Sequence, residues 1–169
     1  MTARVLIAGA TGVIGRALVP LLRDRGHRVT ALVRKPSLAA GAEPDGIVVA
    51  DALDAPATAS AVLSARPDVV VHLLSALGGA TGTPAADGLE ETARLRTQGT
   101  ANLITAAARA GASRIVAASI AFATAPAGGP VLTEDAELYL DAPDPGWART
   151  VRAVAEHERL VLGTPGLPG

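Results

Sequence analysis

The sequence predicts an α/β fold with a doubly wound parallel sheet of about five strands in the order 3-2-1-4-5. Short apolar runs such as VLIA, VTALV and DVVVHLL are typical of strands buried on both faces, as in a parallel sheet covered by helices. These runs alternate with longer segments of helical periodicity, which is the element order of α/β folds. A length of 169 residues suits one domain, which we expect to span residues 1–169.

The predicted elements are separated by short turns. Strands are expected at 3–8, 28–34, 47–50, 68–74 and 114–119, and helices at 13–25, 55–65, 88–110 and about 147–162. Repeated Pro, Gly and Asp between Ala125 and Gly146 indicate a surface excursion between the last strand and the last helix.

The first strand runs directly into three glycines with the spacing G-x-x-G-x-x-G, namely Gly9, Gly12 and Gly15. A glycine turn between a buried strand and a helix lets the backbone approach a pyrophosphate, and the positive end of the helix dipole then faces that anion. Gly15 would also let the helix pack close to the strand. This context predicts a Rossmann-type dinucleotide site, in which Thr11, Val13 and Ile14 of the same turn contact the cofactor. A glycine-rich turn that holds no ligand is the alternative.

The end of the second predicted strand bears on the choice of dinucleotide. NAD sites place a carboxylate about 20 positions beyond the glycines, where it binds the ribose 2′-hydroxyl. This sequence has Arg34 and Lys35 there instead. A guanidinium suits a 2′-phosphate, so the prediction is NADP(H) in preference to NAD(H), with a solvated basic loop as the alternative.

Composition excludes several classes of function. A net charge of −1 gives no electrostatic case for nucleic acid or an anionic membrane surface as a partner. The chain has no cysteine, which excludes disulfides and thiolate catalysis. His27, His72 and His157 are scattered without ligand spacing, so no metal site is predicted. No run approaches the roughly 20 apolar residues of a membrane span, and we expect a soluble, cytoplasmic protein.

From the first strand to about residue 162, the sequence resembles the N-terminal part of extended or atypical short-chain dehydrogenase/reductases. These are the NAD-dependent epimerase/dehydratase-like proteins and their NmrA-like relatives. The most specific stretch is GATGVIGRALVPLLRDRGHRVTALVRKP. The resemblance implies that Asp51, with Ala52 beside it, contacts the adenine amino group. It also implies that Leu74, Ser75 and Ala76 pass the cofactor's phosphates and nicotinamide ribose.

The family's proton-transfer residues are missing from the matching positions. Its catalysts carry a Tyr-x-x-x-Lys pair on the helix after the fifth strand, but Lys35 is the only lysine in this chain. Trp147 stands near the expected tyrosine, and Arg152 could at best take the lysine's space. Arg96 stands where the family often has an asparagine. The family's serine at the end of the fifth strand falls at or beside Ser119, so the resemblance implies Ser119 as the one catalytic candidate.

Two further expectations concern the interior histidine and the last helix. His72 lies inside an apolar strand and is predicted to be a core residue rather than a catalyst. Glu156, His157 and Glu158 are predicted to form a solvated helix face.

The resemblance also covers only part of the family's length. We expect a chain truncated at its C-terminus that lacks the family's C-terminal substrate domain, which would leave the strand near residues 115–119 as an open sheet edge. A second copy or another partner would then cover that edge.

Three hypotheses about function follow. The first is an NADP(H)-dependent oxidoreductase or epimerase-like enzyme that acts on an unidentified small molecule. The second is a non-catalytic sensor or regulatory module that binds NADP(H). The third is an inactive fragment that keeps only the fold.

Overall fold

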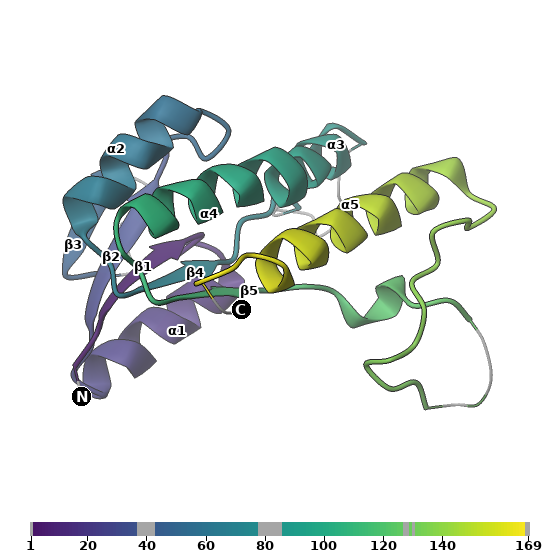
Figure 1. The fold of residues 1–169 in the computed structure, drawn as a ribbon, viewed down its shortest axis with the longest axis horizontal. Coiled ribbons are helices and arrows are strands. Elements are labelled where there is room, and N and C mark those ends of the chain that lie inside the picture. The colour runs from purple at the N-terminus through teal and green to yellow at the C-terminus, as the bar shows by residue number, and fades with distance from the viewer. Residues whose placement is uncertain (1, 37–42, 78–85, 127–128, 130, 168–169) are drawn as a thin grey trace.

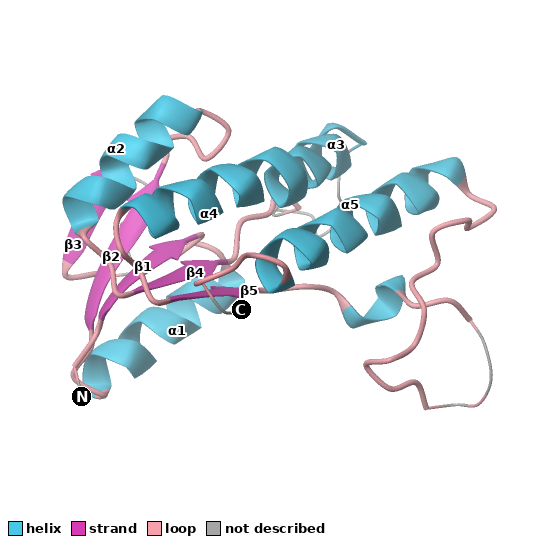
Figure 2. Ribbon diagram, in the orientation of Figure 1, coloured by secondary structure: helices cyan, strands magenta, loops and turns pink. Residues whose placement is uncertain are grey.

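Five parallel strands form one sheet in the order β3-β2-β1-β4-β5 (Figures 1 and 2). The computed structural model describes residues 2–36, 43–77, 86–126, 129 and 131–167. The strands are β1 (Arg4–Ala8), β2 (Arg28–Val33), β3 (Gly46–Val49), β4 (Val69–His72) and β5 (Arg114–Ala117). The predicted fold class and strand order are therefore confirmed.

The helices cover both faces of the sheet unequally. Figure 1 shows α1 (Val13–Asp24) on one face, and α2 (Ala55–Ala65), α4 (Thr100–Arg109) and α5 (Pro145–Leu162) on the other. Helix α3 (Ala86–Arg94) leads into α4 through the π-helical turn η2 (Leu95–Gly99), and the 3₁₀ turn η3 (Ala121–Ala123) follows β5. Among the described helices, none is long and apolar enough to cross a bilayer.

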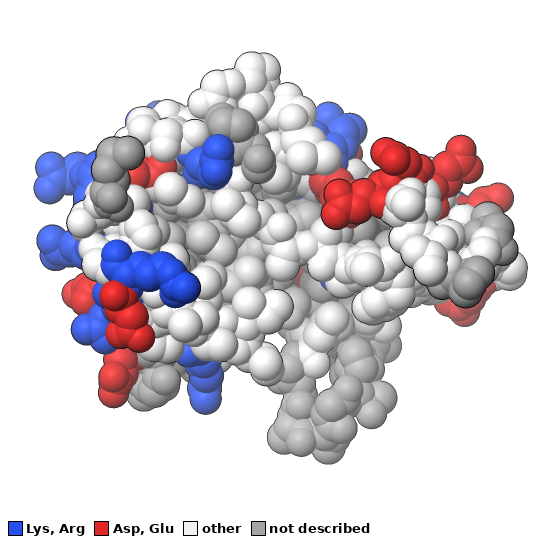
Figure 3. Space-filling model, turned by 90° about the horizontal axis from the view of Figure 1, so that it is seen from below, with Lys and Arg blue, Asp and Glu red and all other residues white. Residues whose placement is uncertain are grey.

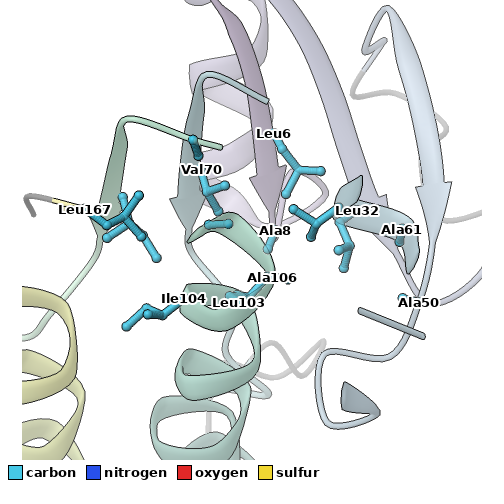
Figure 4. Close-up of a cluster of buried hydrophobic side chains, with 14 of the residues drawn as sticks. Leu6, Ala8, Leu32, Ala50, Ala61, Val70, Leu103, Ile104, Ala106 and Leu167 are labelled. Carbon is cyan, nitrogen blue, oxygen red and sulfur yellow. The ribbon is translucent and has the colours of Figure 1, made fainter. Parts of the chain in front are cut away.

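Strand β1 is buried on both of its faces, as its unbroken apolar sequence predicts. Val5 and Ile7 belong to the cluster on the α1 side, whereas Leu6 belongs to the cluster under α4. Figure 4 shows the second cluster, in which side chains from β1, β2 and β4 meet those of Leu103 and Ala106 of α4. The interior strand of the sheet therefore fixes the two helical layers relative to each other.

Four of the predicted strands extend too far at their carboxyl ends. The strands predicted to end at residues 34, 50, 74 and 119 end at Val33, Val49, His72 and Ala117. The reason is that the chain leaves the sheet at this edge, within one or two residues of the last paired position, and composition does not mark that point.

The long helix predicted over 88–110 contains a π turn that its periodicity does not reveal. A π turn adds one residue to a helical turn without changing the apolar pattern on either side, and such turns are frequent at functional sites. Here η2 buries Leu95, Arg96 and Gly99. Burial lowers the pKa of the Arg96 guanidinium.

Strand β5 lies at one end of the sheet, as predicted, and its Val116 is 46% exposed. The segment after α5 returns to the core, where Leu167 is buried (Figure 4). That a second copy of the chain or another protein covers the β5 edge stays a prediction.

Charged side chains lie toward the two ends of the face seen in Figure 3. Lys and Arg lie mainly at the end near the N-terminus, where several Asp and Glu lie among them, and Asp and Glu gather at the opposite end, with a largely uncharged area between the two ends. Among the described residues on this face, the basic side chains form no continuous stripe of the kind that binds a nucleic-acid backbone.

The turn from β1 to α1 is packed too closely for side chains at two of its glycines. Gly9 has a φ of +96°, and a Cβ there would lie 2.7 Å from the carbonyl carbon of Leu73. A Cβ on Gly15 would lie 2.3 Å from the carbonyl oxygen of Gly9. At Gly12, by contrast, the nearest atom would be 3.4 Å away, which is tolerable contact.

We therefore expect Gly15→Ala to lower the free energy of unfolding by about 2–3 kcal/mol, because the added methyl group must displace α1 from β1. Gly12→Ala is the matched control and should cost less than about 1 kcal/mol. Urea denaturation followed by circular dichroism measures both. Equal stability of the two variants would contradict the close packing at Gly15.

Candidate functional site

A cavity of about 600 Å³ opens at the carboxyl ends of β1, β2, β3 and β4. This volume lies within the range of about 300–1,000 Å³ that is common for small-molecule sites. The residues that line it are Gly9, Thr11, Gly12, Val13, Ile14, Gly15, Arg16, Leu32, Val33, Arg34, Ala50, Asp51, Ala52, Leu73, Leu74, Ser75, Leu77, Glu91 and Leu95. Four strand ends and the beginning of α1 thus converge on one space.

The beginning of α1 presents backbone donors to this cavity. Gly12 is the N-cap residue, and as a glycine it offers no side chain to the first turn, which contains no acidic residue. The N–H groups of residues 13–15 have no acceptor within the helix, because the first intrahelical bond runs from Arg16 N–H to Gly12 O (2.9 Å). Arg16 also donates from Nε to the carbonyl oxygen of Thr11 (2.9 Å), which fixes the turn. An anion in the cavity would meet these unpaired donors and the positive end of the helix dipole.

An ion pair stands at the end of β2. The Arg34 guanidinium lies 3.0 Å from Oε1 of Glu91 on α3, and both side chains are part of the cavity lining. Sequence reasoning predicted Arg34 but missed Glu91. No motif spacing connects residues 57 positions apart, so only the fold could reveal this neighbour.

The loop after β3 is held from the helical side. Asp51 Oδ1 accepts the Leu53 N–H (2.9 Å), which closes a local turn. Asn102 donates to the Ala52 carbonyl (2.9 Å), and Gln98 donates to the Leu53 carbonyl (3.1 Å). These contacts from η2 and α4 position Asp51 and Ala52 at the cavity.

The loop after β4 is anchored by a chain of buried hydrogen bonds. The Leu74 N–H donates to His72 Nδ1 (3.2 Å), so the neutral His72 ring carries its proton on Nε2. That atom lies 3.0 Å from the Thr100 hydroxyl, which lies 2.7 Å from His157 Nδ1. The prediction that His72 is a satisfied core residue is confirmed. The backbone N–H of Leu74, a residue that lines the cavity, is thereby connected through His72 and Thr100 to His157 of α5.

The solvated face predicted on α5 is wrong in one respect. His157 is only 2% exposed, and its ring stands edge-on to that of His72 at a centroid distance of 5.1 Å. Its Nε2 has no hydrogen-bond partner among the described residues. The charged neighbours suggested solvent, but the fold turns this position of the helix inward.

Eleven of the predicted cofactor residues do line the cavity: Gly9, Thr11, Gly12, Val13, Ile14, Gly15, Arg34, Asp51, Ala52, Leu74 and Ser75. Within the described part of the chain, the lining does not include Lys35, Ala76 or Ser119. Ala76 instead donates its N–H to the buried Thr92 hydroxyl (2.9 Å).

Residues 119–124 follow the carboxyl end of β5, and none of them is part of the lining described by the structure. The Ser119 hydroxyl donates to Oε1 of Glu158 on α5. Ser119 therefore lies against the last helix, beyond the end of β5.

Helix α5 supplies no acid–base pair. Asp144 caps it by accepting the Trp147 N–H (2.6 Å), and the Trp147 ring stacks on Phe122 at 5.7 Å. Four residues after Trp147 comes Val151, which is fully buried, while Arg152 is exposed. Neither position offers the ammonium group of a Tyr-x-x-x-Lys pair.

Comparison with known proteins identifies the family. Residues 5–157 match the model of the NAD dependent epimerase/dehydratase family. The chain belongs to this family. A curated relative from Streptomyces sp, "3-diazoavenalumate denitrifying reductase", is 65% identical over 161 residues, which cover 95% of this chain and 52% of that protein. A "3 beta-hydroxysteroid dehydrogenase/Delta 5-->4-isomerase" from Mycobacterium tuberculosis is 34% identical over 67% of this chain and 30% of its own length.

Solved structures show the same fold. The Bordetella bronchiseptica enzyme WbmG, in complex with NAD and UDP, superposes with a TM-score of 0.76 at 22% identity, over 98% of this chain and 51% of WbmG. A short-chain dehydrogenase/reductase superfamily protein from Agrobacterium tumefaciens, with bound NAD, gives a TM-score of 0.72 at 26% identity, over 99% of this chain and 47% of that protein. The chain thus spans about half the length of these two structures and of the Streptomyces relative.

The cavity suits a dinucleotide such as NAD, on which the epimerase/dehydratase family depends. A Cβ at Gly9 would collide with the backbone of Leu73, and one at Gly15 with the carbonyl oxygen of Gly9, so the turn leaves no room for side chains at these two positions. The uncapped first turn of α1 provides N–H donors where a pyrophosphate would lie. Shape and donor set both suit this cofactor.

The buried histidines make stability depend on pH. Burial, reinforced by the neighbouring His157, lowers the pKa of His72 to about 3. The folded protein keeps this ring neutral, whereas the unfolded chain protonates it near pH 6.5. Because the unfolded state binds more protons below that pH, the free energy of unfolding should fall by about 2 kcal/mol between pH 7 and pH 5 from His72 alone.

Urea denaturation at the two pH values measures this loss. The variant His72→Gln should be less stable at pH 7 and should lose the part of the dependence that His72 contributes, about 2 kcal/mol, while His157, whose pKa burial also lowers, keeps its own part. His27→Gln removes a histidine outside the network and should keep it. A wild-type protein with the same stability at both pH values would show that the His72 ring is not held neutral.

Proposed function

We propose that this chain forms the coenzyme-binding part of an NAD(P)H-dependent reductase. The observation that carries the proposal is the convergence of the uncapped α1 terminus with four strand ends on one cavity. Membership of the epimerase/dehydratase family and 65% identity to a protein named as a reductase support it.

The preferred coenzyme in this proposal is NADP(H). Arg34 lines the cavity at the end of β2, where NAD sites place a carboxylate. Its guanidinium can bind a 2′-phosphate with two parallel hydrogen bonds, which a 2′-hydroxyl cannot accept.

Replacing Arg34 with Ala should therefore raise the dissociation constant of NADPH by at least about tenfold while changing that of NADH by less than about threefold. Titration followed by nicotinamide fluorescence and thermal stability measures both constants. The matched control is Arg28→Ala, which removes a charge at the amino end of the same strand. An equal loss for both coenzymes would exclude a role for Arg34 in recognising the phosphate.

The proposed substrate class is a small molecule with a carbon-bound diazonium group, by analogy with the Streptomyces relative. The N–H groups at the start of α1 and the Arg34 side chain would hold the reduced coenzyme, which would supply a hydride to the carbon: a C–H bond would form as the C–N bond breaks, dinitrogen would leave and the coenzyme would end oxidised. This exchange needs no proton donor. The position four residues after Trp147 holds the buried Val151, and this absence of a Tyr-x-x-x-Lys pair is compatible with such a reaction.

In this proposal the residues of the chain bind the coenzyme and orient it. The N–H groups at the start of α1 hold the pyrophosphate, and Arg34 holds the ribose phosphate. The His72 and Thr92 side chains fix the backbone of the loop after β4 along the cavity wall.

Isotope transfer tests the reaction. With NADPH deuterated at C4 and an aryl diazonium salt, we expect one deuterium in each product molecule and one dinitrogen released per coenzyme oxidised. Gly12→Ala should abolish the protein-dependent part, because the added methyl group would narrow the turn in which the pyrophosphate is proposed to lie. A product without deuterium, whose new hydrogen came from solvent, would exclude direct hydride transfer. Coenzyme binding without turnover would favour a regulatory binding module, and a folded protein without binding would favour an inactive fragment.

A further inference from the structure

We propose that Glu91 weakens the preference of the cavity for NADP(H) by holding the Arg34 guanidinium and by repelling a 2′-phosphate. This inference rests on the proposed function, because it concerns the coenzyme bound in the same cavity. The observation behind it is the ion pair that joins α3 to the end of β2.

The pair places a carboxylate where the sequence offered none. NAD sites take this carboxylate from the end of the second strand, and here that position is occupied by Arg34. Glu91 Oε1 lies 3.0 Å from Arg34 Nη1 and lines the same cavity. A 2′-phosphate bound by Arg34 in this position would therefore lie close to the Glu91 carboxylate. Helix α3 supplies the acidic residue that the strand lacks.

The two side chains favour opposite coenzymes. A 2′-phosphate gains from the guanidinium but is a like charge to the carboxylate, and it must take Arg34 from its present partner. A 2′-hydroxyl can donate a hydrogen bond to the same carboxylate, as it does in NAD sites. Arg34 thus favours NADP(H), and Glu91 opposes that preference.

The ion pair is accessible enough to exchange partners. The side chains of Arg34 and Glu91 are 62% and 39% exposed, and an ion pair at such a surface contributes little to stability. Lys35 is not part of the lining within the described part of the chain, whereas Arg16 adds a second cation and Asp51 a second carboxylate. Arg34 and Glu91 are the two charged groups of the lining that contact each other directly.

The test is the variant Glu91→Gln, which keeps the shape of the side chain and removes its charge. We expect the dissociation constant of NADPH to fall about five- to tenfold, and that of NADH to stay the same or to rise about two- to threefold. Glu90→Gln, on the neighbouring exposed residue of α3, is the matched control and should change neither constant. Circular dichroism and thermal unfolding confirm that both variants are folded.

The outcomes separate this inference from the proposed function. If the wild-type protein binds neither NADPH nor NADH, the proposed function fails and this inference fails with it. If the wild type binds a coenzyme but Glu91→Gln leaves the ratio of the two constants unchanged, only the role of Glu91 is overturned. A change of the same size in Glu90→Gln would also overturn it, because the effect would then come from the general charge of α3.

Discussion

The close contact between the β1–α1 turn and its neighbours is the constraint on which the rest of the structure depends. Gly9 brings the turn against the backbone of Leu73, and Gly15 brings α1 against the carbonyl of Gly9. Because α1 begins at this distance, its unpaired N–H groups face the cavity rather than bulk solvent. The same contact seats Val19 of α1 on the apolar face of the sheet. Packing and ligand binding therefore require the same small residues.

A second group of elements holds the other walls of the cavity. The helices on the opposite face reach across with Gln98, Asn102 and Thr92, each of which bonds to the backbone of a strand exit. His72 is a buried residue that connects the Leu74 amide to Thr100. Buried polar groups are retained where they find partners, and here those partners are the loops that shape the site.

The residues that line the cavity support the proposed coenzyme more fully than they support the proposed reaction. Its lining comes from the glycine turn, the strand exits and α3, and none of these provides a proton donor of the family's usual kind. Trp147 stacks on Phe122 outside that lining, within the part of the chain that the structure describes. The Streptomyces relative is about twice as long as the segment that matches it.

The sequence by itself determined the sheet, its strand order and the glycine turn, because these depend on local signals: unbroken apolar runs, helical periodicity and glycine spacing. It also predicted eleven residues of the cavity lining, since parallel strands deliver their carboxyl ends to one edge. The tertiary structure alone decided the place of Glu91 beside Arg34, the π turn before Thr100 and the inward position of His157. Each of these depends on contacts between residues far apart in the chain, or on one residue added to a helical turn, and neither leaves a periodic signal in the sequence.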